Sequence, residues 1–246
     1  MKYHFFIESD QVSGGIAEIR GSDVNHIKNV LRMHPGEEIV LSDGVLQYNC
    51  RVESLEADRV LASVCGTVRE DRELPARIIL LQGIAKGERM DTLVQKSVEL
   101  GASGIIPLMM ERTVVRLEDK KAAQRQERWQ AIAESAAKQS GRGLIPEVSP
   151  VTDFARLKDL AAGFDRLFMA YELAEGMKAT REAFAAVKPG EKVGLIIGPE
   201  GGISRGEAEL ALACGAEAIS LGRRILRTET AGPAALAMLN YVLERD

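Results

Sequence analysis

Two stretches near the carboxy terminus constrain the fold most, because each reads as a buried strand that ends in a glycine-bearing loop. One is residues 195–204, Leu-Ile-Ile-Gly-Pro-Glu-Gly-Gly-Ile-Ser. The other is residues 219–232, Ile-Ser-Leu-Gly-Arg-Arg-Ile-Leu-Arg-Thr-Glu-Thr-Ala-Gly. In open α/β sheets, ligands bind beyond the carboxyl ends of the strands. We therefore expect the two loops to form one ligand pocket, rich in backbone N–H and C=O groups.

Local signals at the end of the first loop predict where the next helix begins. Ser204 followed by Glu207 is the pattern of a capping box, which satisfies free N–H groups at a helix start. Gly201 and Gly202 are expected to allow positive φ angles and the close approach of a ligand to the backbone. Glycines in such loops can also serve only as turn residues, and the sequence leaves both interpretations open.

The second loop precedes a final helix, expected over residues 231–243. Thr228 or Thr230 is predicted to cap this helix, with Pro233 in its first turn. One helix face carries small and apolar side chains that could pack on the core or on a partner subunit. These are Ala234, Met238, Tyr241 and Val242.

Strand and helix patterns alternate from residue 77 onward, which predicts a parallel sheet covered by helices. Strands are expected at 77–84, 105–110, 166–170, 192–197 and 218–221. Helices are expected at 88–100, 118–139, 152–162, 177–187, 205–214 and 231–243.

The amino-terminal part reads as a small β-rich module. Strands are expected at 5–7, 38–42, 45–55 and 59–68, and Ser22 is predicted to cap a helix that runs to about residue 32. The turn at Asp43-Gly44 favours antiparallel pairing. The charged segment 69–73 reads as a linker, so we expect one domain over residues 1–72 and a second over residues 73–246.

Composition limits the cellular setting and the class of protein. The chain has 246 residues and a net charge of −4, and it shows neither a signal-peptide pattern nor an apolar run close to a membrane span. Its three cysteines, Cys50, Cys65 and Cys214, fit neither a disulfide framework nor a zinc site. We expect a cytoplasmic protein without a membrane partner.

A local excess of basic residues interrupts the acidic balance between positions 112 and 142. Such a stripe can bind phosphates even on an acidic protein, although a solvated helix face has the same pattern. The basic residues are Arg112, Arg116, Lys120, Lys121, Arg125, Arg128, Lys138 and Arg142.

The predicted pocket contains no histidine, because His4, His26 and His34 all lie in the amino-terminal module. This nearly excludes a Ser-His-Asp triad, a Cys-His pair or a histidine metal site, so no metal is expected. The remaining polar groups suit binding and positioning better than covalent catalysis. Among them Glu200, Glu229 and Arg227 are candidates for handling protons and charge.

Residues 198–204 and 220–231 together resemble the RsmE family. These proteins are 16S ribosomal RNA uridine-N3 methyltransferases of the knotted SPOUT methyltransferase superfamily. Further matching blocks lie at 26–33, 86–91, 95–101, 107–112 and 139–142, so the resemblance covers nearly the whole chain.

The resemblance implies an amino-terminal PUA-like β-barrel that binds RNA, followed by a SPOUT α/β domain with a trefoil knot. It also implies a homodimer, an S-adenosylmethionine cofactor and action on N3 of a uridine in 16S rRNA of the small ribosomal subunit. The residues carried over as cofactor contacts are Ile197, Gly198, Glu200, Gly201, Leu221, Gly222, Ile225, Leu226 and Thr230.

Because N3 of uridine carries a proton, methylation there suggests roles for the charged residues. We expect Arg227 to stabilise the imide anion that develops on the base, and Glu229 or Glu200 to handle the N3 proton. Glu229 could instead complement the positive end of a helix. RNA-backbone contacts are expected at Arg32, Arg112, Arg116, Arg128 and Arg142.

Two other interpretations of the residues remain open. One is an α/β enzyme that binds a different adenine-containing cofactor, such as a dehydrogenase. The other is a non-catalytic protein that binds RNA or assists ribosome assembly through the amino-terminal module.

Overall fold

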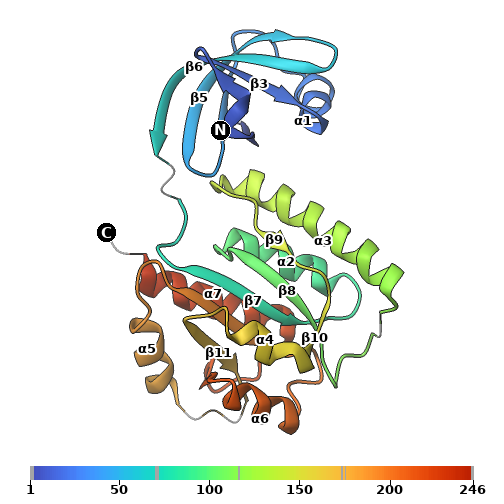
Figure 1. Cartoon of the computed structure of the whole chain (residues 1–246), viewed down its shortest axis with the longest axis vertical. Helices are drawn as coiled ribbons and strands as arrows, with labels where there is room; N and C mark the ends of the chain where they lie inside the picture. Colours follow the sequence, from blue (N-terminus) through green and yellow to red (C-terminus); the bar gives the residue numbers. More distant parts are fainter. Residues whose placement is uncertain (1–2, 70–71, 116, 173, 175, 245–246) are drawn as a thin grey trace. The chain divides into compact units, whose positions relative to one another are not determined.

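The computed structural model describes residues 3–69, 72–115, 117–172, 174 and 176–244 (Figure 1). The chain divides into two compact units. The first comprises residues 1–73 together with 137–144, and the second comprises 74–136 together with 145–246. Residues 70–71 of the predicted linker lie outside the described residues. No pattern in the sequence predicted that residues 137–144 belong with the first unit.

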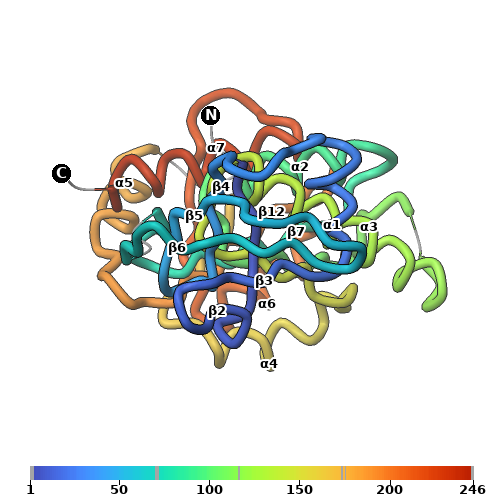
Figure 2. Tube along the Cα trace, turned by 90° about the horizontal axis from the view of Figure 1, so that it is seen from above, coloured from blue at the N-terminus to red at the C-terminus, as the bar shows by residue number. Residues whose placement is uncertain are grey.

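The first unit is built on a six-stranded sheet with the order β1-β4-β5-β6-β3-β2. Its pairs are antiparallel except for β1 and β4, which are parallel. Figure 2 shows β5 beside β6 and β6 beside β3. The strands are β1 (Tyr3–Phe6), β2 (Val12–Ser13), β3 (Ile16–Arg20), β4 (Glu38–Ser42), β5 (Leu46–Leu55) and β6 (Arg59–Arg69).

The strands on either side of the Asp43-Gly44 turn form at the predicted positions and pair antiparallel, but β2 and β3 were missed. The predicted helix is shorter than expected: α1 (Ser22–Asn25) continues into a π-helical turn, η2 (His26–Val30). Ser22 is not its cap. Gly21 holds that position with a φ of 72°, a conformation that glycine adopts without steric cost.

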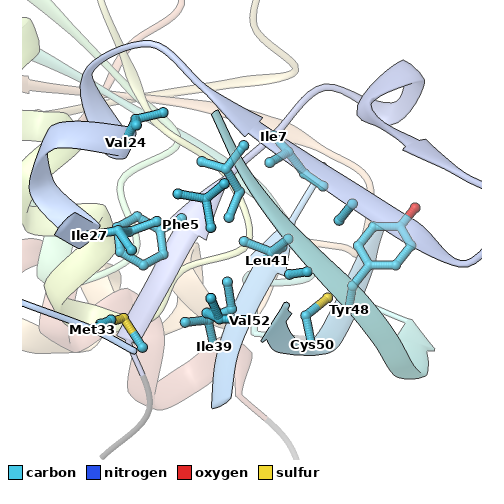
Figure 3. Close-up of a cluster of buried hydrophobic side chains, with 14 residues drawn as sticks. Phe5, Ile7, Val24, Ile27, Met33, Ile39, Leu41, Tyr48, Cys50 and Val52 are labelled. Carbon is cyan, nitrogen blue, oxygen red and sulfur yellow. The ribbon is translucent and has the colours of Figure 1, made fainter. Parts of the chain in front are cut away.

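A single apolar cluster fills this unit. Side chains from β1, β4 and β5 meet those from the helical segment, and Figure 3 shows Phe5, Ile27, Leu41 and Cys50 within it. Burial raises the pKa of the Cys50 thiol to about 12. This cysteine therefore acts as a small apolar side chain and not as a reactive thiol.

The second unit contains the predicted parallel sheet. Its strand order is β10-β8-β7-β12-β11-β13, with β9 paired to β8, and every pair is parallel. The strands are β7 (Arg77–Gly83), β8 (Gly104–Met109), β9 (Glu147–Val148), β10 (Thr152–Asp153), β11 (Arg166–Ala170), β12 (Lys192–Ile197) and β13 (Glu217–Ile219).

Helices cover both faces of this sheet. Ile79, Leu81 and Ile196 point to the face where Leu157 and Ala211 pack, so α4 and α6 lie there. Leu80 points the other way, toward Gly232 in α7, where an added Cβ would lie 3.6 Å from Leu80 Cδ2. The helices are α2 (Arg89–Glu99), α3 (Asp119–Ser140), α4 (Leu157–Ala161), α5 (Met177–Ala185), α6 (Arg205–Ala213) and α7 (Thr228–Leu243).

Two helix predictions need correction. Residues 152–153 pair with β8 as strand β10, and the Asp153 side chain then caps a short 3-10 turn. Helix α7 begins at Thr228, three residues before the predicted start, so Pro233 lies inside the helix and not in its first turn. In the part of the chain that the structure describes, no helix is both long and apolar enough to span a membrane.

The carboxyl ends of the central strands pack against each other through backbone. A Cβ atom on Gly83, at the end of β7, would lie 2.5 Å from both the Cδ and the N of Pro199, beyond the end of β12. Only glycine fits here, so the loop after β12 is held directly against β7. The trefoil knot implied by the resemblance stays a prediction, since strand order and register do not establish it.

The contact at Gly83 predicts a position-specific cost for an added methyl group. Gly83→Ala should lower the free energy of unfolding by about 1–3 kcal/mol, because the backbone at Pro199 must move to accept the methyl. Gly206→Ala is the matched control in the same unit, since nothing lies within 4 Å of its Cβ position in α6. The control should be neutral or stabilising in chemical denaturation. Equal stabilities of the two variants would contradict the packing described.

Candidate active site

A cavity of about 540 Å³ opens at the carboxyl ends of three neighbouring strands, β11, β12 and β13. The residues that line it include Ala170, Ile197 and Ile219 from the strand ends, and both glycine-bearing loops. The sequence-based expectation that the two loops form one pocket is thus confirmed.

The first loop, residues 198–204, is held by the start of α6 and by the segment after β8. Ser204 and Glu207 form the predicted capping box, and the same Glu207 carboxylate accepts a hydrogen bond from the Glu111 N–H at 2.7 Å. Gly202 has a φ of 73°, as expected. Gly201 does not have a positive φ. Its backbone instead lies so close to Arg112 that a Cβ would be 2.8 Å from the Arg112 Cβ.

The start of α7 is tied to the first loop by a buried hydrogen-bond network. The Thr228 hydroxyl donates to the Gly198 carbonyl at 2.6 Å and accepts from the Gln82 amide at 2.9 Å. Gln82 is fully buried in β7, and Thr228 is 5% exposed. Sequence reasoning missed Gln82, although a lone polar residue within an apolar strand is the signal that could have identified it.

The second loop, residues 220–227, is anchored from α5. The Ser220 N–H donates to the Thr180 hydroxyl at 2.9 Å, and this hydroxyl donates back to the Ser220 carbonyl at 3.0 Å. Gly222 follows with a φ of 110°, a conformation that favours glycine. These contacts fix the direction in which the loop leaves the sheet, ahead of Arg223, Arg224 and Arg227, which line the pocket.

Arg89 lies close to two of the carboxylates that line the pocket, Glu200 and Glu229. Glu200 Oε1 accepts hydrogen bonds from the Lys86 N–H at 2.8 Å and from Arg89 Nη1 at 3.1 Å. Arg89 Nε lies 3.8 Å from Glu229 Oε1. Burial alone would raise the pKa of Glu200, but the hydrogen bonds and the arginine outweigh it and lower this pKa. Glu229 Oε2 is buried without a hydrogen-bond partner among the described residues.

Most predicted pocket residues line the cavity, and one does not. Thr230 is exposed in α7 and is not among the residues that line the pocket. Its contact with a cofactor therefore stays a prediction. The predicted site residues that do line the cavity are Ile197, Gly198, Glu200, Gly201, Leu221, Gly222, Ile225, Leu226, Arg227 and Glu229.

The five arginines predicted to contact RNA have different surroundings. Arg112 and Arg128 are exposed. Arg112 donates a hydrogen bond to the Gly201 carbonyl at 3.1 Å, and Arg128 donates one to the Asp91 carboxylate at 2.6 Å. Arg32 is exposed in the first unit with a φ of 53°. Arg116 lies outside the described residues.

Arg142 requires a correction. It is only 5% exposed, and its guanidinium pairs with the Glu73 carboxylate, which also accepts a hydrogen bond from the Gly143 N–H at 3.1 Å. A side chain buried in this pair is not available to a phosphate. This ion pair, together with the Ser42 hydroxyl that donates to the Gly143 carbonyl at 2.8 Å, ties residues 137–144 to the rest of the first unit.

Comparison with known proteins agrees with this architecture. A family model described as an RNA methyltransferase domain matches residues 72–240, and a second, described as an RNA methyltransferase PUA domain, matches residues 19–65. The chain is 37% identical to the ribosomal RNA small subunit methyltransferase E of Bacillus subtilis, over 92% of this chain and 90% of that protein.

Solved structures show the same similarity over the whole fold. The methyltransferase E of Neisseria gonorrhoeae, bound to S-adenosyl methionine, is 34% identical with a TM-score of 0.82, and 98% of each chain is covered. A putative methyltransferase of Legionella pneumophila, also in complex with this cofactor, is 31% identical with a TM-score of 0.84, at the same coverage. The chain belongs to the ribosomal RNA small subunit methyltransferase E family, the RsmE family of RNA methyltransferases.

Proposed function

We propose that the protein is an S-adenosylmethionine-dependent methyltransferase that modifies N3 of a uridine in 16S rRNA of the small ribosomal subunit. The observation that carries the proposal is the single pocket between the two loops, where backbone groups, arginines and two carboxylates converge. Relatives named as small-subunit rRNA methyltransferases, and two similar structures holding the cofactor, support it.

The pocket fits S-adenosylmethionine in size and in chemistry. Its volume lies within the usual range for a site that holds a small cofactor. Apolar side chains suit the adenine ring, and the backbone groups of the two loops suit its nitrogens. The residues that would hold the cofactor are Ile197, Gly198, Glu200 and Gly201 from the first loop, and Leu221, Gly222, Ile225 and Leu226 from the second.

When bound, S-adenosylmethionine supplies a methyl group that its sulfonium already activates. The protein therefore has to orient the base, exclude water and manage one proton, and orientation alone can lower a barrier by roughly 7–11 kcal/mol. Arg227 lines the pocket and stabilises the negative charge that develops on the imide. Glu229 or Glu200 accepts the N3 proton, a contribution of typically about 10²–10⁴-fold.

RNA binding in this proposal uses both units. Arg112 and Arg128 contact phosphates beside the pocket, and Arg32 does so from the unit that matches the PUA model. The target uridine must leave its stack to enter the pocket. Since the substrate is ribosomal RNA, the protein acts in the cytoplasm.

The protein acts as a homodimer in this proposal. Among the described residues, the most exposed large apolar side chains are Ile225 on the second loop, at 89%, and Tyr241 on α7, at 87%. Ile225 lines the pocket, so a second copy seated there would help to close the site. Sedimentation should give a dimer.

Mapping the product tests the proposed function directly. Small subunits that lack the modification should gain one methyl group at a uridine N3 when incubated with the protein and labelled S-adenosylmethionine. Calorimetry should show binding of S-adenosylmethionine and none of NAD. Binding of NAD in calorimetry would favour a dehydrogenase. RNA binding without incorporation of methyl groups would favour a non-catalytic RNA-binding protein.

Arg227→Ala should lower kcat by about 10²–10³-fold, because it removes the cation that stabilises the developing anion. Affinity for S-adenosylmethionine should stay within about threefold, since the cofactor-holding groups named above remain in place. Arg181→Ala, exposed on α5, is the matched control and should leave kcat unchanged. A kcat within a few-fold of the parent enzyme in Arg227→Ala would refute the assignment.

RNA affinity should fall steeply with salt concentration, because phosphate contacts release bound counterions. Arg112→Ala should reduce the slope of log K against log salt by about 0.7–0.9, the value expected for one lost phosphate contact. The Arg181→Ala variant should keep the parent slope in the same filter-binding series. A flat salt dependence of the parent protein would remove phosphate contacts as the main source of affinity.

A further inference from the structure

The segment 86–91, Lys-Gly-Glu-Arg-Met-Asp, has no role in the function as described so far, although it matches the family. In the structure it leads into α2 and reaches the pocket at two points. The Lys86 N–H and the Arg89 guanidinium both bond Glu200 Oε1, and Arg89 is itself part of the pocket lining. From α2, Asp91 also accepts a hydrogen bond from Arg128 of α3 at 2.6 Å.

We infer that Arg89 is a positioning residue that separates the roles of the two pocket carboxylates. It clamps Glu200 as an anchor of the first loop, and it orients Glu229 so that Oε2 receives the proton of the target base. The second half of this inference rests on the proposed function, whereas the clamp on Glu200 does not.

Glu200 is fixed in a way that suits an anchor. One of its oxygens is bonded by a backbone N–H and by a guanidinium, and its side chain is only 21% exposed. Hydrogen bonds to the ionised form make a carboxylate a weaker base, and the lowered pKa of Glu200 agrees with this. Proton transfer becomes less favourable as the base weakens, so Glu200 is the poorer acceptor.

Glu229 is held at one oxygen and lacks a hydrogen-bond partner at the other. Its Oε1 lies 3.8 Å from Arg89 Nε, which sets the direction of the carboxylate without consuming its second oxygen. Oε2 is buried and lacks a partner among the described residues, although buried polar atoms are nearly always hydrogen-bonded. A donor on a bound ligand satisfies this oxygen, and the N3–H group of a uridine is such a donor.

This arrangement supports transfer of one proton from the base to Glu229. The N3–H bond breaks and its proton passes to Glu229 Oε2, while the electron pair stays on N3. That pair forms the new bond to the methyl carbon, and the electrons of the broken carbon–sulfur bond remain on the sulfur. Arg227 offsets the charge on the base during the transfer.

Kinetics of full-length variants on unmodified small subunits test the division of roles. Glu229→Gln should lower kcat by about 10²–10⁴-fold, and Glu200→Gln by no more than about tenfold. Arg89→Met should lower kcat by up to about 10²-fold through misplacement of the carboxylate. The KM for RNA and the affinity for S-adenosylhomocysteine should each change less than threefold in Arg89→Met. Arg89→Lys should recover part of kcat, because it keeps a cation beside Glu229.

Three kinetic results would overturn the inference. A raised KM with unchanged kcat in Arg89→Met would make Arg89 a phosphate contact. A loss in Glu200→Gln as large as that in Glu229→Gln would make Glu200 the proton acceptor. An unchanged kcat in Arg89→Met would remove the positioning role. Arg156→Met is the matched control, because Arg156 pairs with Asp159 on the surface and does not line the pocket.

A ligand-free measurement separates failure of the clamp from failure of the proposed function. Arg89→Met, Glu200→Gln and the double variant form a thermodynamic cycle of unfolding temperatures. Each single variant should lower Tm by about 2–4 °C, and the double variant should lose little more than either single variant. Additive losses would refute the clamp whatever the substrate is. If the Tm losses are not additive but the protein methylates no uridine, the contact between Arg89 and Glu200 stands and the proposed role of Glu229 is rejected.

Discussion

The hydroxyl of Thr228 is the connection on which the rest of the site depends. It donates to the Gly198 carbonyl and accepts from Gln82, so one buried group joins β7, the loop after β12 and the start of α7. The strands are parallel, and their carboxyl ends therefore meet at one edge of the sheet. The hydrogen bond from Thr228 to the Gly198 carbonyl fixes the two glycine-bearing loops relative to each other. The two loops therefore form one pocket.

Close backbone packing explains why this pocket presents main-chain groups more than side chains. Gly83 lies against Pro199, and Gly201 lies against Arg112, at distances that leave no room for a Cβ. Charged side chains also line the pocket, and among them Arg89 forms ion pairs with both Glu200 and Glu229. Such a site orients its ligands and stabilises charge. That is the requirement for transfer of a methyl group that its donor has already activated.

The sequence predicted the features that depend on local patterns. The apolar strands of the parallel sheet, the capping box at Ser204 and the joint pocket all follow from residues close together in the chain. Features that depend on tertiary contacts were missed. Helix α7 starts at Thr228 because that residue is buried and bonded to Gln82, which outweighs the helix-start signal of Pro233. Arg142 belongs to a basic stripe in the sequence, but in the fold it is buried and paired with Glu73, 69 residues earlier in the chain.

A crystal structure with S-adenosylmethionine tests the central claim most directly. The account predicts one cofactor molecule in contact with both loops, residues 198–204 and 220–227. The Lys86 N–H and Arg89 should still hold Glu200, and the Thr228 hydrogen bonds should remain intact. A cofactor bound elsewhere on the chain, or in contact with only one of the two loops, would contradict it.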